Sequence, residues 1–341
     1  MTRVGYRDGH FDDLNRPHWR EDSPRPLVWN VWYPAAEESV AEDIPVGPPG
    51  APIFLLDALA QDAAPAPGRH PVVLLSHGTG GSAVGLHWLA RHLAAEGFIV
   101  LGANHHGNTA REPYLPEGFL AWWERSRDLS LLLDLMASEG PLAGSLDLDR
   151  VFAVGFSLGG HAVLGLLGAR TDMEQFRAWA LAQPAELEVS RRGPREFPDL
   201  DQHVDSLLAT SARFKESWTR QLDDYGDPRI RAACLLAPAP TIRGLTEASV
   251  RAIDRPLKIM VGDADIEAPP PLSHWLKERL PHSELTILGP DIGHYVFLQD
   301  ATPRGRTGMP EIFIDPPGVD RLAVQREVAA AVAGFLGRQG R

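Results

Sequence analysis

The 341-residue chain has one cysteine, three lysines and no apolar run long enough to cross a membrane. The single cysteine, Cys234, excludes an intramolecular disulfide, and its place in an apolar run indicates a small buried residue rather than a nucleophile. The formal net charge of −12 argues against a nucleic-acid binder and against a basic protein of the membrane surface. The first residues lack the apolar segment of a signal peptide, so we expect a cytoplasmic protein.

Metal and phosphate motifs are also missing. There is no H-E-x-x-H pattern, and the adjacent His105 and His106 follow a strand, where neighbouring side chains point in opposite directions. We therefore expect no metal ion and no cofactor. The glycine-rich stretch 77–81 lacks the lysine of a Walker motif and does not fit G-x-G-x-x-G, which disfavours phosphate binding.

A G-x-S-x-G pattern is present at Gly155-Phe-Ser157-Leu-Gly159. The apolar run 151–154 before it predicts a buried parallel strand, and residues 160–169 after it predict a helix. A sharp turn between a strand and a helix presents a serine hydroxyl for attack on a carbonyl, and small neighbours let the two backbones approach closely. The pattern therefore predicts a nucleophilic serine at Ser157.

Strand and helix patterns alternate along most of the chain. Such alternation predicts one α/β domain over residues 1–341, with a mostly parallel sheet and helices on both faces. The expected strands are 27–34 (antiparallel), 70–75, 98–101, 150–156, 230–237, 256–261 and 285–288. The expected helices are 83–96, 119–139, 160–169, 173–183, 203–224, 270–280 and 319–337. Residues 36–69 are expected to form a long loop with one short helix near 53–59.

Residues 171–228 interrupt this rhythm with a polar, proline-containing stretch. An insertion directly after the helix that follows Ser157 would lie above the carboxyl ends of the strands, so we expect a helical cap or lid. Its aromatic residues Trp179 and Trp218, together with His105, are the candidates for substrate contact. The alternative is a structural embellishment away from the site.

Three residues in chain order, Ser157, Asp265 and His294, could form a catalytic triad. A serine needs a base to take its proton, a histidine serves as that base, and a carboxylate holds the correct imidazole tautomer. Asp263 and Asp291 compete for the acid role. We favour Asp265 because it stands a few residues beyond the 256–261 strand, where its loop can reach the histidine loop.

Acyl transfer also needs two backbone N–H groups that face the developing oxyanion. The residue after the nucleophile, Leu158, would supply one of them. The glycine-rich loop at 77–81 also lies between a predicted strand and a predicted helix. It would supply the other amide from Thr79.

These motifs together resemble the α/β-hydrolase superfamily. More narrowly, they resemble a bacterial group labelled predicted dienelactone hydrolases, which is itself similar to platelet-activating-factor acetylhydrolase. The resemblance is carried by stretches 28–34, 76–81, 104–109, 155–160, 227–230, 262–269 and 293–294. It implies the α/β-hydrolase fold and serine hydrolase chemistry.

Three departures bear on what the resemblance implies. Asn104 and His106 stand where that group has Asp and Pro. True dienelactone hydrolases use a cysteine nucleophile, whereas this chain has Ser157, so the label does not carry over as an activity. The acetylhydrolase places its acid after the preceding strand, where residues 236–240 contain no carboxylate, and this strengthens Asp265.

We therefore expect a metal-independent serine hydrolase that acts on small-molecule carboxylic esters with small to medium acyl groups. An amidase or a lactonase with the same triad stays open. A non-catalytic ligand-binding protein of the same fold is the alternative from another class. The oligomeric state stays open, and we expect neither a nucleic-acid partner nor a membrane span.

Overall fold

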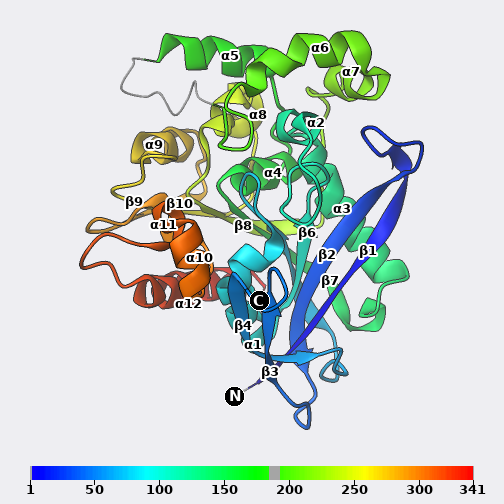
Figure 1. Cartoon of the computed structure of the whole chain (residues 1–341), viewed down its shortest axis with the longest axis vertical. Coiled ribbons are helices and arrows are strands. Elements are labelled where there is room, and N and C mark those ends of the chain that lie inside the picture. The colour runs from blue at the N-terminus through cyan, green and yellow to red at the C-terminus, as the bar shows by residue number, and fades with distance from the viewer. Residues whose placement is uncertain (1, 184–192, 341) are drawn as a thin grey trace.

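One mixed sheet forms the centre of the protein in a computed structural model that describes residues 2–183 and 193–340. The strands of these residues form a ten-stranded sheet in the order β10-β9-β8-β7-β5-β6-β2-β1-β4-β3 (Figure 1). Neighbours from β10 to β6 are parallel, whereas β2 pairs antiparallel with both β6 and β1. The strands are β1 (Arg3–Pro17), β2 (Pro24–Ala35), β3 (Glu42–Val46), β4 (Phe54–Gln61), β5 (His70–Ser76), β6 (Ile99–Asn104), β7 (Leu146–Phe156), β8 (Ile230–Leu236), β9 (Leu257–Gly262) and β10 (Ser283–Leu288).

Helices follow most of the parallel strands. The α-helices are α1 (His87–Ala95), α2 (Pro116–Leu120), α3 (Glu124–Ser138), α4 (Leu158–Leu166), α5 (Met173–Ala182), α6 (His203–Thr210), α7 (Ala212–Thr219), α8 (Glu247–Arg251), α9 (Pro270–Arg279), α10 (Pro303–Gly308), α11 (Pro310–Phe313) and α12 (Arg321–Gln339). Short 3₁₀ helices are η1 (Ala83–Leu86), η2 (Ala143–Ser145), η4 (Leu200–Gln202), η5 (Pro240–Gly244) and η6 (His294–Phe297).

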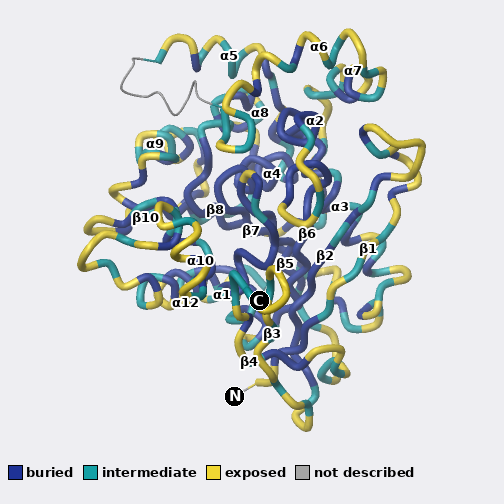
Figure 2. Tube along the Cα trace, in the orientation of Figure 1, coloured by how far each residue is buried: buried dark blue, intermediate teal, exposed yellow. Residues whose placement is uncertain are grey.

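Two apolar clusters cover the two faces of the sheet. Successive side chains of a strand point to opposite faces, so in β5 Val72 and Leu74 join one cluster while Val73 and Leu75 join the other. The first face is packed against α1 and α12, and the second against α3, α4 and α9. The central strands are therefore buried from both sides, as the dark tube in Figure 2 shows. This arrangement confirms the predicted parallel sheet with helices on both faces.

Helices α5, α6 and α7 form a separate layer at one end of the molecule (Figure 1). A third apolar cluster joins this layer to the body: Val204 and Phe214 from the layer pack with Phe119 and with Leu158, the first residue of α4. The layer thus rests on the end of the sheet at which β7 leads into α4. Residues 184–192 of the predicted 171–228 insertion lie outside the described residues.

The expectation of a loop with one helix over residues 36–69 is wrong. This stretch contains β3 and β4, which pair antiparallel at the edge of the sheet. In β4 the buried residues Leu56 and Leu59 are three apart, because a register shift and the positive φ of Ala58 (53°) interrupt the alternation. A spacing of three resembles a helix, which explains the error.

Two predicted helices are divided in the structure. The 119–139 prediction spans the end of α2 and all of α3, and the 203–224 prediction covers α6 and α7. The second break lies at Ser211, whose backbone is extended and whose hydroxyl accepts a hydrogen bond from the Phe214 amide. A serine in this geometry starts a new helix. The long first strand, β1, was not predicted.

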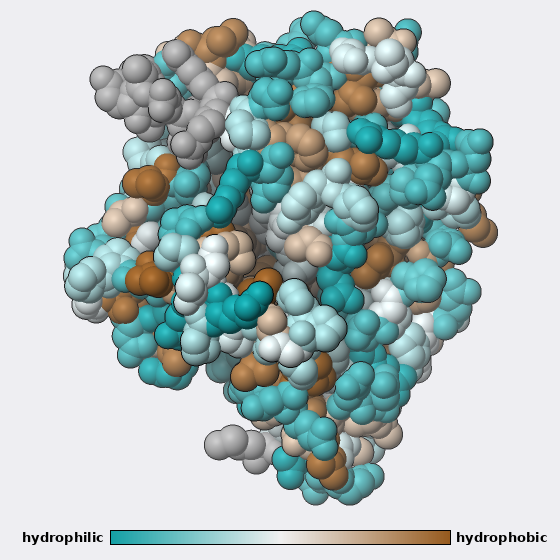
Figure 3. All heavy atoms as spheres, viewed as in Figure 1, coloured by the Kyte–Doolittle hydropathy of each residue, from teal (hydrophilic) through white to brown (hydrophobic). Residues whose placement is uncertain are grey.

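The outer surface in the view of Figure 3 is mostly hydrophilic, with apolar side chains in scattered groups. None of the helices in the described residues has both the length and the apolar character needed to span a membrane.

The connection from β7 to α4 generates a prediction about stability. A methyl group added at Gly155 would lie 2.1 Å from the carbonyl oxygen of Gly159, which is a backbone atom that cannot move aside. We expect Gly155→Ala to lower the free energy of unfolding by about 1–3 kcal/mol, the usual cost of overpacking. Urea denaturation measures this change.

Gly337→Ala is the matched control, because Gly337 lies in α12 and an added Cβ would meet nothing within 4 Å. Alanine in a helix interior is favoured over glycine by about 0.5–1 kcal/mol. Equal stability of the Gly155→Ala variant and the wild type would contradict the close packing of β7 against α4.

Candidate functional site

Ser157 stands at the turn between β7 and α4 with φ 54° and ψ −119°. A positive φ is unfavourable for a residue with a side chain, and the surrounding contacts hold it in place. The Ser157 amide donates to the carbonyl of Leu236 at 2.9 Å, and its own carbonyl accepts from Ala239 at 3.2 Å. A Cβ added at Gly159 would lie 2.1 Å from the Ser76 carbonyl oxygen, so glycine is required there too.

His294 and Asp265 are joined by a hydrogen bond of 2.8 Å from Nδ1 to Oδ2. Both side chains are buried, although they lie 29 positions apart in the chain. Because a carboxylate accepts, Nδ1 carries the proton, and Nε2 of a neutral ring keeps its lone pair. The other oxygen of Asp265 accepts the Ala268 amide at 2.7 Å, which fixes the orientation of the carboxylate.

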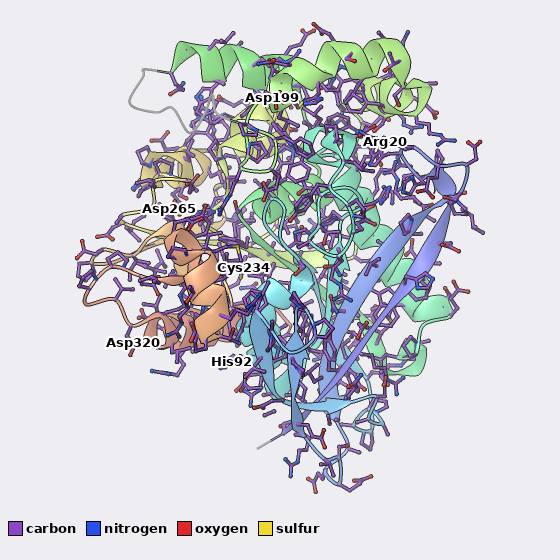
Figure 4. The ribbon with its side chains drawn as sticks, viewed as in Figure 1. Arg20, His92, Asp199, Cys234, Asp265 and Asp320 are labelled. Carbon is purple, nitrogen blue, oxygen red and sulfur yellow. The ribbon has the colours of Figure 1, made fainter. Side chains whose placement is uncertain are left out.

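The imidazole of His294 packs against the residue that precedes the serine. The ring centroids of His294 and Phe156 are 4.8 Å apart. No hydrogen bond joins Ser157 and His294 within the described part of the chain, but catalytic hydrogen bonds are often long before substrate binds. In Figure 4 Asp265 lies beside the ends of β9 and β10, on the side of the molecule below α9.

The competing carboxylates lie in other environments. Asp263 is exposed, and its Oδ1 accepts the amide of Ile292 at 3.1 Å. Asp291 adopts a positive φ of 61° within the loop that leads to His294. Both residues therefore shape the histidine loop, whereas Asp265 is the one that contacts the ring.

The glycine-rich loop at residues 76–81 lies next to the serine. A Cβ added at Gly78 would lie 3.2 Å from the Cβ of Ser157. Thr79 is the exposed residue in the buried run 76–80. Leu158 begins α4, and the first amides of a helix have no acceptor within it. The loop that carries Thr79 and the start of α4 at Leu158 both lie next to Ser157, and the role of their amides as oxyanion donors stays a prediction.

A cluster of buried charged side chains lies between β1, β2 and α3. Arg16 forms ion pairs with Glu124 at 2.8 Å and with Asp128 at 2.6 Å, and Arg25 pairs with Glu124 at 3.4 Å. Burial alone would raise the pKa of Glu124, but the charges of Arg16 and Arg25 outweigh it and lower this pKa to about 2. The pKa of Asp128 is likewise held well below its usual range. Both carboxylates are therefore ionised at neutral pH.

His105 connects this cluster to β5. Its Nδ1 donates to Asp128 Oδ2 at 2.9 Å, and its Nε2 accepts from the Ser76 hydroxyl at 2.9 Å. Burial lowers its pKa to about 4, so the ring is neutral. Both ring nitrogens are engaged within the protein, so we now propose that His105 positions the loop rather than contacts substrate.

The two predicted aromatic residues lie in the helical layer. Trp179 of α5 packs against Phe176, with the guanidinium of Arg243 5.4 Å from its ring. Trp218 of α7 packs against Trp123 of α3, with ring centroids 5.7 Å apart. The structure therefore places both residues where the layer meets the body, and their contact with substrate stays a prediction.

Two site residues were missed in the sequence. Arg125 of α3 is buried and donates to carbonyls of the 76–81 loop. It shares a helical stripe with Leu129, Leu132 and Met136, and a charge within an apolar stripe is the signal that could have identified it. Glu196 lies over the same loop, where a Cβ added at Gly80 would be 2.5 Å from its Oε1, and burial raises its pKa. No sequence signal marks Glu196.

The described residues contain no group of three or more His, Cys, Asp or Glu side chains that could hold a metal ion. Cys234 is fully buried in β8, and burial raises the pKa of its thiol above its usual value. It therefore lies in the core, as the sequence predicts.

Comparisons with known proteins identify the fold and the family. The fold is that of the α/β-hydrolase superfamily, as the sequence predicts. Within it, the chain belongs to the family described as "Serine aminopeptidase, S33", which matches residues 68–297, more than half of the chain. A comparison with curated proteins finds no match.

Solved structures with a similar fold include an esterase and a peptidase. A ferulic acid esterase from Streptomyces cinnamoneus matches with a TM-score of 0.65 and 19% sequence identity. The match covers 100% of this chain and 92% of the esterase chain. A puromycin-hydrolysing peptidase from Mycobacterium tuberculosis matches with a TM-score of 0.52 and 12% sequence identity. The match covers 98% of this chain and 39% of the peptidase chain. Sequence identities this low establish a shared fold but not a shared substrate.

The buried charges predict how stability responds to acid. The pKa of Glu124 is about 2 in the folded state, against about 4.3 in an unfolded chain. A lowered carboxyl pKa stabilises the fold above pH 4.3, and this contribution disappears as pH falls toward 2. Glu124→Gln should therefore lower the free energy of unfolding by about 3–5 kcal/mol at pH 7, with a difference from wild type that shrinks by about 2 kcal/mol between pH 4.3 and pH 2.

Urea denaturation at a series of pH values measures this effect. Glu216→Gln is the control, because Glu216 forms an exposed ion pair with Arg220 and its loss should change stability by about 0.5 kcal/mol or less. A constant difference between Glu124→Gln and the wild type across this pH range would contradict the prediction.

Proposed function

We propose that this hydrolase cleaves carboxylic esters of small to medium acyl groups through an acyl-enzyme on Ser157. The observation that carries the proposal is the 2.8 Å hydrogen bond between His294 and Asp265, beside a serine in a strained turn. The similarity in fold to a ferulic acid esterase makes esters the first substrates to test.

In this mechanism the Ser157 hydroxyl attacks the ester carbonyl while His294 Nε2 takes its proton. Asp265 holds the proton on Nδ1 and stabilises the imidazolium that forms. The amides of Thr79 and Leu158 donate to the oxyanion of the tetrahedral intermediate. The imidazolium then protonates the leaving alcohol, and water activated by the same ring releases the acid and regenerates the serine.

The helical layer formed by α5, α6 and α7 serves as a cap in this proposal. Support comes from the apolar cluster in which Val204 and Phe214 of the layer lie with Leu158, the residue next to the nucleophile. An apolar roof at this position favours an apolar acyl or alcohol group.

An amide substrate is the second candidate function. The family description, a serine aminopeptidase, favours it, and the same serine, base and oxyanion donors serve both reactions. Paired substrates with one acyl group, a p-nitrophenyl ester and a p-nitroanilide, distinguish the two functions when each rate is divided by that of the uncatalysed hydrolysis. A larger rate enhancement for the anilide than for the ester would assign the enzyme to amides.

Ser157→Ala should lower kcat for p-nitrophenyl esters by about 10⁶, the loss seen when a triad nucleophile is removed. The measurement is hydrolysis of a series from acetate to palmitate, with the variant beside the wild type. The chain length that gives the fastest turnover reports the depth of the pocket. A variant that keeps more than a tenth of the activity would remove Ser157 from the mechanism.

A serine-reactive phosphonate separates the enzyme from a ligand-binding protein of the same fold. The reagent should add one label to the wild type and none to Ser157→Ala, as intact-protein mass spectrometry would show. A folded wild type without label and without turnover would favour the binding protein.

Asp265→Asn should lower kcat by about 10⁴, because an amide can stabilise the wrong imidazole tautomer and cannot stabilise the imidazolium. Asp263→Asn is the matched control, since its side-chain oxygen can still accept the Ile292 amide and it does not contact His294. We expect less than a tenfold loss there, measured as kcat on one p-nitrophenyl ester. The opposite ranking would make Asp263 the triad acid.

A further inference from the structure

A buried arginine holds the backbone of the glycine-rich loop. Arg125, in the first turn of α3, is 2% exposed. Its Nη1 donates to the His77 carbonyl at 2.6 Å, and its Nη2 donates to the Gly78 carbonyl at 3.3 Å. One guanidinium thus binds two successive carbonyls of the loop that lies beside Ser157.

The direction of one carbonyl determines the direction of the next amide. A trans peptide group is planar, and its C=O and N–H point in opposite directions. The Gly78 carbonyl faces Arg125, so the Thr79 N–H of the same peptide group faces away from Arg125. Gly78 lies against Ser157, where a Cβ at Gly78 would be 3.2 Å from the serine Cβ.

The ring of His77 holds the same carbonyl. Its Nδ1 is 2.6 Å from the Gly78 oxygen, and its Nε2 accepts the His105 amide at 3.3 Å. The donor at Nδ1 and the acceptor at Nε2 define a neutral tautomer. Burial holds the pKa of His77 well below its usual value, which keeps the ring in this form.

The environment of Arg125 argues against a role in stability alone. Within residues 2–183 and 193–340, no carboxylate lies within ion-pair distance of its guanidinium, and its Nε has no hydrogen-bond partner. Burial lowers its pKa to about 9, so it stays charged at neutral pH. A buried charge with incomplete partners is unfavourable, and an apolar side chain would stabilise the fold better.

We propose that Arg125 is a positioning residue that directs the Thr79 amide toward the oxyanion formed on the Ser157 adduct. The proposal rests on the proposed function, since it assigns a role within that serine chemistry. A planar fork suits two neighbouring carbonyls, whereas the single ammonium of lysine does not reproduce the pair. Arg125→Lys therefore keeps the buried charge and removes the paired geometry.

The test compares Arg125→Lys and Arg125→Met with the wild type on one p-nitrophenyl ester. Loss of one oxyanion donor lowers kcat by about 10²–10³. We expect a loss in this range with a change in KM below about threefold, because the donor acts on the transition state and not on the bound ester. The affinity for phenylboronic acid, which forms a tetrahedral anionic adduct on the serine, should fall by a similar factor.

A double-variant cycle tests whether Arg125 acts through Thr79. Thr79→Pro removes the amide proton itself and should give a comparable loss of kcat. Adding Arg125→Lys to Thr79→Pro should then change kcat by less than about threefold, because coupled residues are not additive. A full second loss in the double variant would overturn the proposal.

Leu133→Ala is the control for lost stability, because Leu133 is a fully buried residue of α3 that lies two turns along the helix from Arg125 and packs in an apolar cluster against the sheet. It should lower the free energy of unfolding but leave kcat per folded enzyme unchanged. If the Arg125 variants behave as this control does, or if neither of them folds at 15 °C, Arg125 serves folding and the proposal is overturned.

The boronate measurement also distinguishes a failure of the proposed substrate class from a failure of the proposed role of Arg125. A wild type that binds phenylboronic acid at Ser157 but turns over neither esters nor anilides would contradict the proposed substrate class. The ratio of boronate affinities between wild type and Arg125→Lys would still test Arg125. A ratio near one would overturn the role of Arg125 whether or not an ester is the substrate.

Discussion

One strained residue, held between a strand and a helix, is the constraint on which the site depends. Ser157 adopts φ 54° and ψ −119°, a conformation that costs about 1–3 kcal/mol for a residue with a side chain. It persists because β7, α4 and the end of β5 approach so closely that one methyl group at Gly155 or Gly159 would overlap backbone atoms. The parallel strands that hold it are buried on both faces, so a closely packed part of the fold supports this strained residue.

Patterns that depend on local burial could be predicted from the sequence, and patterns that depend on distant contacts could not. Buried parallel strands appear as apolar runs, so β5 to β10 and the residues that follow them, including Ser157, were predicted. β4 was missed because the bulge at Ala58 gives its buried residues a helical spacing.

The choice of Asp265 over Asp263 agrees with the contact to His294. The sequence does not show why Arg125 is buried, because its acceptors are carbonyls of a loop 47 and 48 positions away.

The charge cluster below the site is weak evidence for stability, because a well-packed apolar replacement is often as stable or more so. Its hydrogen bonds instead fix the orientation of the chain at the end of β5. Asp128 accepts a hydrogen bond from His105, His105 accepts one from the Ser76 hydroxyl, and Ser76 ends β5, directly before the glycine-rich loop. Hydrogen bonds specify angles that apolar packing leaves free. These hydrogen bonds therefore orient the glycine-rich loop beside Ser157, as the proposed role of the Thr79 amide requires.

Helix α3 supports both the loop and the helical layer above it. Its first turn carries Arg125, which binds the loop, and Glu124, which accepts the hydroxyl of Ser217 from α7. Trp123, just before the helix, also donates to the Ser217 hydroxyl at 3.0 Å. The separation between the loop and α7 is therefore determined by one rigid element and not by two independent ones. A displacement of α3 would therefore move the loop and the layer together relative to Ser157, which β7 and α4 hold in place.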